Sequence, residues 1–183
     1  AGKYIVFLNA NAYDKERDVR TIIAGEFQKS NLAAALQTAE LICGRLDEDK
    51  IYEALSQIRI SGRMEEIAPG IIVDVSHNIQ GMQGFVQTVE ANYHGMKKRI
   101  LFAASHQNEE EYMKNILKTI PEIEAFYTVG IHKRRIDEAE FQDAFRKMID
   151  RNQETTVCFV VGSFYLAGMA KEFINQEEEN VRL

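Results

Sequence analysis

From about residue 70 onward, short apolar segments of strand length alternate with segments whose apolar residues have helical spacing. Short apolar runs of strand length occupy 71–75, 99–104, 125–131 and 155–162. Apolar residues recur at helical spacing over 80–93, 109–120, 139–151 and 165–176. Parallel strands need crossover helices, and such helices cover both faces of their sheet. The pattern therefore predicts an α/β fold, with a Rossmann-like, mainly parallel sheet that has helices on both faces.

The first 57 residues follow a different pattern. Strands are predicted for KYIVFLNA and VRTIIAGEF, and helices for 30–43 and 48–57. Ser30 is the expected N-cap of the first helix, whose Ala/Leu-rich body has high helix propensity. These elements fit poorly into the later alternation, so they either pack on its edge or form the end of another domain. We expect a small α+β segment at 1–57 and the main domain at 58–183.

Composition and charge narrow the classes of function. Of the 183 residues, 45% are hydrophobic and 27% are charged, which is typical of a globular protein with one main domain. The net charge of -6 argues against binding to nucleic acid or to an anionic membrane, because both need a clustered basic surface. The basic runs 97–99 and 133–135 are interpreted as solvated flanks of strands. No apolar run approaches the roughly 20 residues of a membrane span.

Cysteine usage and the first residues favour a cytoplasmic location. Cys43 and Cys158 lie in apolar stretches outside any CxxC or Cys/His cluster, so we interpret both as buried, reduced thiols. The start of the chain, AGK, lacks the hydrophobic region of a signal peptide.

Polar residues follow the first apolar run of the main domain directly. Asp74, Ser76, His77 and Asn78 come at its end, where ligands of open parallel sheets bind. A carboxylate there can accept hydrogen bonds from ribose hydroxyls, and the N–H groups that open the next helix favour an anion. Alternatively, Asn78 only caps that helix, and His77 packs or faces water.

Two further residues have chemistry that suits a nucleotide. Arg63, in SGRMEEI, carries the rigid fork of donors that phosphate prefers, although a surface salt bridge is the simpler role. Asn31 follows Ser30, where its amide can bond an adenine edge or help to cap the helix. Capping is the safer interpretation for Asn31 when it is considered alone.

Other motifs exclude some chemistry. VVGSFYLAG is not a GxSxG nucleophile elbow, so Ser163 is interpreted as a helix cap and no catalytic residue is assigned. The chain has no GxxxxGK[ST] phosphate loop and no GxGxxG after its first main strand, which argues against a lone dinucleotide-binding oxidoreductase. His94, His106 and His132 lie singly without metal-ligand spacing, so we expect them exposed and expect no metal site in this chain.

Together these segments resemble a known family. SGRMEEI, IIVDVSHNIQG, VVGSFYLAG and EFQKSNLAAALQTAE are similar, in order and spacing, to motifs of the folylpolyglutamate synthase and dihydrofolate synthase family. That family belongs to the Mur ligase superfamily, and the resemblance is to its C-terminal domain. It extends over roughly residues 25–176.

The resemblance implies an ATP-dependent ligase that joins glutamate to a folate or dihydropteroate carboxylate through an acyl phosphate. The family's ATP-contacting asparagine, arginine and aspartate fall on Asn31, Arg63 and Asp74, and His77 falls beside the nucleotide. The phosphate loop, the Mg ligands and most of the folate site belong to an N-terminal ATPase domain that is missing here. Residues 1–57 would be the tail of that domain. We expect a monomer without ligase activity on its own.

Departures from the family pattern bear on the substrate. Ser61, Met64 and Ile79 stand where the family usually has proline, an aromatic residue and proline, and HQNEEE replaces its Asp-Lys-Asp. Two alternatives therefore stay open. One is a Mur-type ligase for another amino acid, and the other is a non-catalytic nucleotide-binding module.

Overall fold

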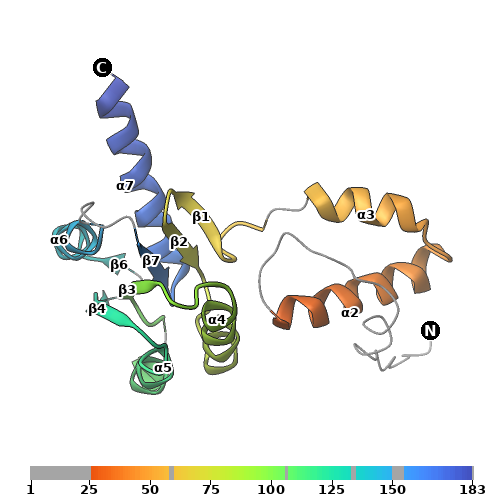
Figure 1. Cartoon of the computed structure of the whole chain (residues 1–183), viewed down its shortest axis with the longest axis horizontal. Helices are drawn as coiled ribbons and strands as arrows, with labels where there is room; N and C mark the ends of the chain where they lie inside the picture. The colour runs from red at the N-terminus through yellow and green to blue at the C-terminus, as the bar shows by residue number, and fades with distance from the viewer. Residues whose placement is uncertain (1–25, 58–59, 106, 133–134, 150–154, 183) are drawn as a thin grey trace. The chain divides into compact units, whose positions relative to one another are not determined.

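The structure is a computed structural model, and it describes residues 26–57, 60–105, 107–132, 135–149 and 155–182 (Figure 1). The chain divides into two units, Ala1–Arg59 and Ile60–Leu183, and each is described by itself. This division falls close to the expected boundary between residues 57 and 58.

The described part of the first unit consists of helices α2 (Glu26–Cys43) and α3 (Glu48–Gln57). Asp47 caps α3, because its Oδ1 accepts hydrogen bonds from the N–H groups of Asp49 and Lys50. The predicted N-cap at Ser30 is wrong, since α2 already begins at Glu26. Glu, Gln and Lys before Ser30 favour helix and continue it upstream.

The two strands predicted near the N-terminus have different outcomes. KYIVFLNA lies outside the described residues. VRTIIAGEF also lies outside the described residues, except for Glu26 and Phe27, which belong to α2. The strand prediction is wrong for these two residues.

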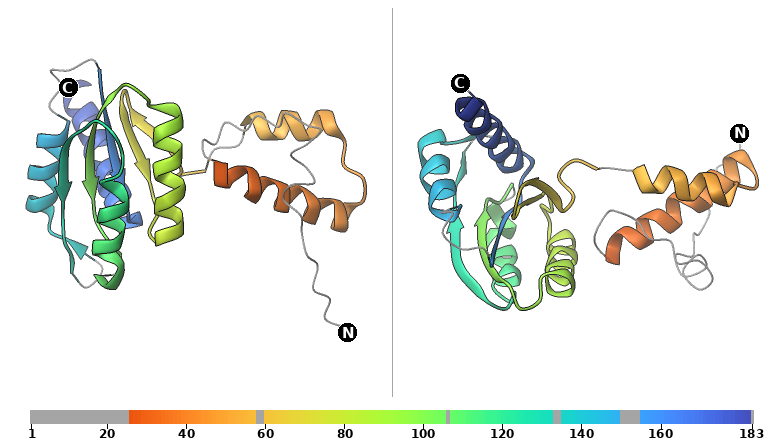
Figure 2. Two further views of the ribbon diagram at one scale, coloured as in Figure 1. Left: turned by 60° about the horizontal axis from the view of Figure 1, so that its bottom comes forward. Right: turned by 45° about the horizontal axis from the view of Figure 1, so that its top comes forward.

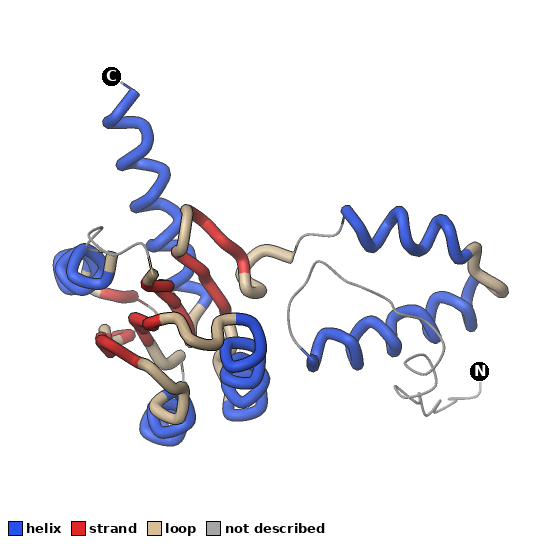
Figure 3. The backbone as a smooth tube through the Cα atoms, viewed as in Figure 1, coloured by secondary structure: helices blue, strands red, loops and turns tan. Residues whose placement is uncertain are grey.

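The second unit alternates strands and helices, as Figure 3 shows. Its strands are β1 (Glu65–Ala68), β2 (Ile71–Asp74), β3 (Lys97–Phe102), β4 (Ile123–Thr128), β5 (Ile131–His132), β6 (Arg135–Ile136) and β7 (Thr156–Val161). Its helices are α4 (Ile79–Asn92), α5 (Glu110–Leu117), α6 (Glu138–Met148) and α7 (Phe164–Arg182), with a short 3-10 turn, η1 (Gln107–Glu109), before α5. Each predicted element of the main domain is present, and β1, β5 and β6 were not predicted.

The main sheet has the strand order β1-β2-β7-β3-β4. Strands β2, β7, β3 and β4 run parallel, and only the edge strand β1 pairs antiparallel with its neighbour. The predicted α/β class with a mainly parallel sheet is therefore confirmed. Strand β7, the last in the chain, lies in the middle, so residues far apart in sequence meet at its ends.

Helices cover both faces of this sheet (Figure 2). Ile100, Phe102 and Phe159 point to the face covered by α4 and α5, where Phe85 and Met113 pack. The intervening residues Leu101 and Val160 point to the face of α6 and α7, among the packed rings of Phe141, Phe145 and Phe173. The alternation of side chains along each strand thus builds two apolar layers.

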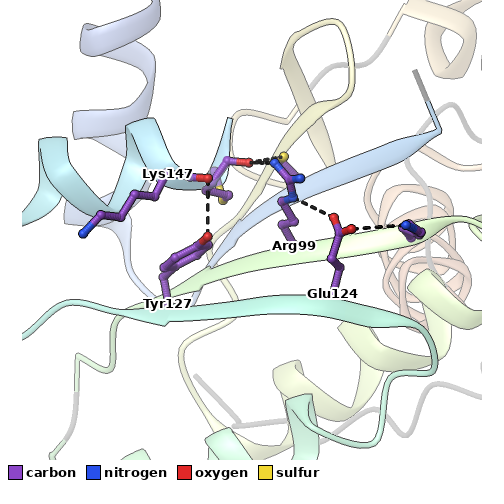
Figure 4. A network of polar contacts seen from close by, with 7 residues as sticks. Arg99, Glu124, Tyr127 and Lys147 are labelled. Atoms are coloured by element: carbon purple, nitrogen blue, oxygen red, sulfur yellow. Dashed lines mark hydrogen bonds and ion pairs between the residues drawn. The ribbon is translucent and has the colours of Figure 1, made fainter. Parts of the chain in front are cut away.

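The basic run 97–99 is not a solvated flank throughout, which corrects that interpretation. Lys98 is fully buried and its Nζ lies 3.1 Å from Glu122. Arg99 donates from Nε to Glu124 at 2.9 Å and from a terminal nitrogen to the Met148 carbonyl at 3.1 Å (Figure 4). The Met148 carbonyl lies at the C-terminal end of α6, where it has no donor within the helix, and Arg99 supplies one. Of the run 133–135, only Arg135 is described, and it is exposed.

The two cysteines differ in exposure, which corrects the prediction that both are buried. Cys43, at the end of α2, is exposed, whereas Cys158 is buried in β7. The Cys158 Sγ donates to the Met148 carbonyl at 3.2 Å. Burial, which outweighs the nearby charge of Arg99, raises the pKa of Cys158 to about 11.

This difference predicts selective thiol labelling. At pH 8 a disulfide reagent should modify Cys43 within minutes and Cys158 only after denaturation, because the thiolate is the reactive form. Mass spectrometry of the labelled chain gives the site. With a chromogenic disulfide reagent, the native Cys43→Ser variant should react so slowly that almost no chromophore is released. Rapid release would contradict the burial of Cys158.

Candidate functional site

The carboxyl ends of the parallel strands bring together the loops that carry chemistry in the second unit. The helices that follow β2 and β3 cover one face of the sheet, whereas α7, which follows the intervening β7, covers the other (Figures 1 and 2). Neighbouring loops therefore diverge at β7. Open α/β sheets bind their ligands at such switch points.

Asp74 lies at this edge, as predicted, but it is almost completely buried. Its side chain is only 1% exposed. Oδ1 accepts a hydrogen bond from the Ser76 N–H at 2.8 Å, and Oδ2 accepts one from the Met64 N–H at 3.0 Å. The carboxylate thus ties the loop before β1 to the end of β2.

Arg63 lies in that loop, which also contains Gly62 and Met64. Gly62 has φ +74°, and a Cβ there would lie 2.6 Å from Val75. Met64 also has a positive φ, 44°, and its N–H is the one held by Asp74. Arg63 is half-buried as a whole residue, and its guanidinium makes no ion pair with another described residue. A surface salt bridge, the simpler role considered for Arg63, is absent from the described structure.

Asn78 is the N-cap of α4. Its Oδ1 accepts a hydrogen bond from the Gly81 N–H at 2.7 Å. The capping role that the sequence suggested is confirmed. It leaves the other N–H groups of the first turn free for a ligand or for water.

His77 lies between the two helices that begin at this edge. Its Nδ1 is 2.9 Å from the Val75 carbonyl, and its ring centroid is 5.6 Å from that of Phe164, at the start of α7. A neutral ring that donates from Nδ1 to this carbonyl leaves Nε2 as an acceptor. Phe164 and Tyr165 are 60% and 45% exposed, so aromatic surface is present beside the histidine.

Ser163 caps α7, as predicted: its Oγ accepts from the Tyr165 N–H at 3.1 Å. Gly162, just before it, has φ +109° and lies against Ala103 and Phe102. Two helix N-termini, those of α4 and α7, therefore open at the same edge of the sheet. Their dipoles favour a negative charge there.

Sequence reasoning placed Ser76 at this edge without giving it a role, and it missed the pairing of Glu65 with Lys171. Ser76 Oγ is buried and has no hydrogen-bond partner among the described residues. Glu65 and Lys171 form an ion pair at 2.6 Å between the start of β1 and α7. No local signal in the sequence pointed to Lys171, which lies 106 positions from Glu65.

Asn31 belongs to the first unit. It lies within α2 and is exposed, so it is not a cap. The loops that carry Arg63, Asp74 and His77 are neighbours in the second unit, since the Val75 N–H donates to the Gly62 carbonyl at 2.8 Å. The nucleotide contacts of these residues and of Asn31 stay predictions.

The described residues contain neither a cluster of metal ligands nor a membrane-spanning helix. Across the described residues, no three side chains of the His, Cys, Asp and Glu types gather as a metal site would need. His94 and His132 are exposed, as expected, and His106 is outside the described residues. No helix in the described ranges combines the length and the apolar character needed to cross a bilayer.

The chain was compared with known families and structures. No protein-family model matches it, and no curated protein matches it. Solved structures do. The folylpolyglutamate synthetase from Lactobacillus casei superposes with a TM-score of 0.65 at 20% identity, over 86% of this chain and 40% of the other. The E. coli FolC protein in complex with DHPP and ADP gives 0.71 at 16% identity, over 81% and 39%.

The folylpolyglutamate synthase of Thermotoga maritima gives a TM-score of 0.63 at 21% identity, over 87% of this chain and 41% of the other. The chain therefore spans about two fifths of the length of these enzymes. The resemblance inferred from the motifs is confirmed at the level of the fold: the chain has the fold of the C-terminal domain of folylpolyglutamate synthases.

Proposed function

We propose that this chain is the C-terminal part of an ATP-dependent ligase that adds glutamate to folate or dihydropteroate. Its contribution would be to close on the nucleotide, and the catalytic groups would belong to the missing ATPase domain. The single observation that carries the proposal is the position of Arg63, whose guanidinium has no ion-pair partner among the described residues. It lies at the edge where α4 and α7 begin.

The geometry suits a phosphate group better than a neutral ligand. Arg63 supplies donors in a rigid fork, and the first turns of α4 and α7 supply free N–H groups. The buried hydroxyl of Ser76 lies over the first turn of α4, 3.3 Å from where a Cβ of Gly81 would be. A buried hydroxyl without a partner is unusual, and a bound anion would give it one.

The predicted ribose contact of Asp74 needs a change at the site. Both carboxylate oxygens already accept backbone hydrogen bonds, and the side chain is covered. Each oxygen keeps acceptor capacity, so a hydroxyl can still bond it if the covering side chains move. We therefore assign to Asp74 first the task of holding the Arg63 loop, and the ribose contact stays a prediction.

ATP, when bound, supplies the phosphoryl group that activates the folate carboxylate. Oriented N–H groups, a lysine and a metal stabilise most of the developing charge in such transfers. By the family resemblance, the Mg ligands and the phosphate loop are assigned to the ATPase domain. Accordingly, a coupled assay of this chain alone should show no glutamate-dependent release of ADP.

The proposed substrates are supported by the structural neighbours. One of them is a complex with DHPP and ADP, and another is an AMPPCP-folate complex of folylpolyglutamate synthase. We therefore assign folate or dihydropteroate, together with glutamate, as the proposed substrates of this chain by analogy of fold. The alternative of another Mur-type ligase would be separated by offering the full-length protein different amino acids.

The role of Arg63 can be tested by nucleotide titration. We expect ATP to shift the Arg63 Nε–Hε signal of the ¹⁵N-labelled chain, and Arg63→Met to weaken binding about tenfold, because a charge-assisted hydrogen bond is lost. Arg146→Met is the matched control, since Arg146 is exposed near the opposite end of α6 and packs on Phe173. Equal loss in both variants, or no shift with ATP, would contradict the proposal.

A further inference from the structure

The loop of residues 60–64, here called the arginine loop, is held by two carboxylates. Asp74 accepts the Met64 N–H at 3.0 Å, and the Oε2 of Glu65 accepts the Gly62 N–H at 2.6 Å. Arg63 lies between these two anchored amides. Met64 is in the left-handed region, where a residue with a side chain is strained. The loop therefore needs its anchors to keep this conformation.

Glu65 is in turn held by α7. The Nζ of Lys171 lies 2.6 Å from Glu65 Oε2 and donates to Ser61 Oγ at 2.6 Å. Ser61 Oγ also approaches Glu65 Oε2, at 3.3 Å. The two charged side chains are 29% and 34% exposed, so water screens the pair only in part. Lys171 and Glu65 are 106 positions apart in the chain, and the contact joins α7 to the arginine loop.

The charges in this cluster have a consequence for Arg63. Glu65 is two positions from Arg63 and carries a negative charge that would attract its guanidinium. Lys171 neutralises this carboxylate, and the guanidinium makes no ion pair with any described residue. Without Lys171, Glu65 would carry an unpaired negative charge two positions from Arg63 and would compete with an anionic ligand.

We propose that Lys171 is a positioning residue, which acts through Glu65 to fix the arginine loop and to keep Arg63 available for a phosphate group. The inference rests on the proposed function for the identity of the ligand. The clamp itself, formed by Lys171, Glu65 and the Gly62 N–H, depends only on the contacts described above.

Binding of inorganic tripolyphosphate to the 183-residue chain tests this role. Lys171→Met should weaken binding about fivefold, as expected for a charge pair that water screens only in part. Lys171→Arg should restore binding to within about twofold. In the double variant Lys171→Met with Glu65→Gln, binding should recover in part, since glutamine keeps an acceptor for Gly62 and removes the competing charge.

Lys147→Met is the matched control for net charge. Lys147 pairs with Asp143 at 2.7 Å on the exposed side of α6, so its loss should leave binding unchanged. The positioning role is overturned if Lys171→Met binds like Lys147→Met, or if the double variant is no better than Lys171→Met alone. Denaturation of each variant shows whether it is folded at the temperature of the titration.

A second measurement needs no ligand. Burial acts to raise the pKa of Glu65, but the hydrogen bonds from Lys171 and Gly62 and the charge of Lys171 outweigh it, so this pKa lies below the ordinary 4.5. The Gly62 amide signal should therefore titrate with Glu65, and Lys171→Met should raise its midpoint. An unchanged midpoint overturns the clamp. If wild type binds no tripolyphosphate while the midpoint moves, the nucleotide function fails and the clamp stands.

Discussion

Gly162→Ala is expected to destabilise the second unit by about 4 kcal/mol, because strain and overpacking add at this position. Gly162 has φ +109°, and a Cβ there would lie 2.5 Å from the Ala103 carbonyl oxygen and 2.7 Å from the Phe102 ring. The oxygen belongs to the backbone next to the central strands and cannot move aside cheaply. Urea denaturation followed by circular dichroism measures the loss.

Gly168→Ala provides the control for Gly162→Ala. Gly168 is an exposed glycine inside α7, and a Cβ there would meet nothing within 4 Å. Alanine should stabilise this helix by about 0.5–1 kcal/mol, because glycine loses more backbone freedom on folding. If both substitutions gave similar small effects, the close packing of β7 against β3 would be wrong at this edge.

Asp74→Ala should cost about 2–4 kcal/mol of unfolding free energy. The substitution leaves the N–H groups of Met64 and Ser76 without their acceptor in a buried place, and an unsatisfied donor there is expensive. Asp74→Asn should cost less, because its amide oxygen can keep one of the two bonds. Hydrogen exchange of the Met64 and Ser76 amides should accelerate in both variants before global unfolding does.

A matched exposed carboxylate separates this effect from the loss of charge. Asp143 pairs with Lys147 on the surface of α6, where both side chains are more than half exposed. Asp143→Ala should change stability by no more than about 0.5 kcal/mol, since exposed pairs contribute little. An equally small effect of Asp74→Ala would mean that Asp74 does not anchor the arginine loop.

Local signals in the sequence were sufficient to predict most helices and strands of the second unit. The short apolar runs of β3 and β7 and the helical spacing in α4 to α7 gave the α/β class, because strands that are apolar on both sides must be covered by helices on both faces of the sheet. Asn78 and Ser163 were identified as caps for a similarly local reason: a short polar side chain just before a helix can bond its free N–H groups.

The N-terminal errors show how far local signals extend. Residues before Ser30 were assigned to a strand, although helix propensity continues through them to Glu26. Cys43 was placed in the core because it lies in an apolar stretch, yet it is exposed. Apolar neighbours in the sequence do not determine whether a residue at the end of a helix faces the core or the solvent.

The sequence by itself determined the alternating elements of the sheet, their caps and the motifs that gather at its carboxyl edge, because periodicity and capping act over a few neighbouring residues. Only the tertiary structure decided that Asp74 is covered and holds Met64, that Lys98 is buried, and that Lys171 reaches Glu65. These contacts join segments distant in the chain. They depend on β1 pairing antiparallel with β2 and on β7 lying at the centre, which no short stretch of residues specifies.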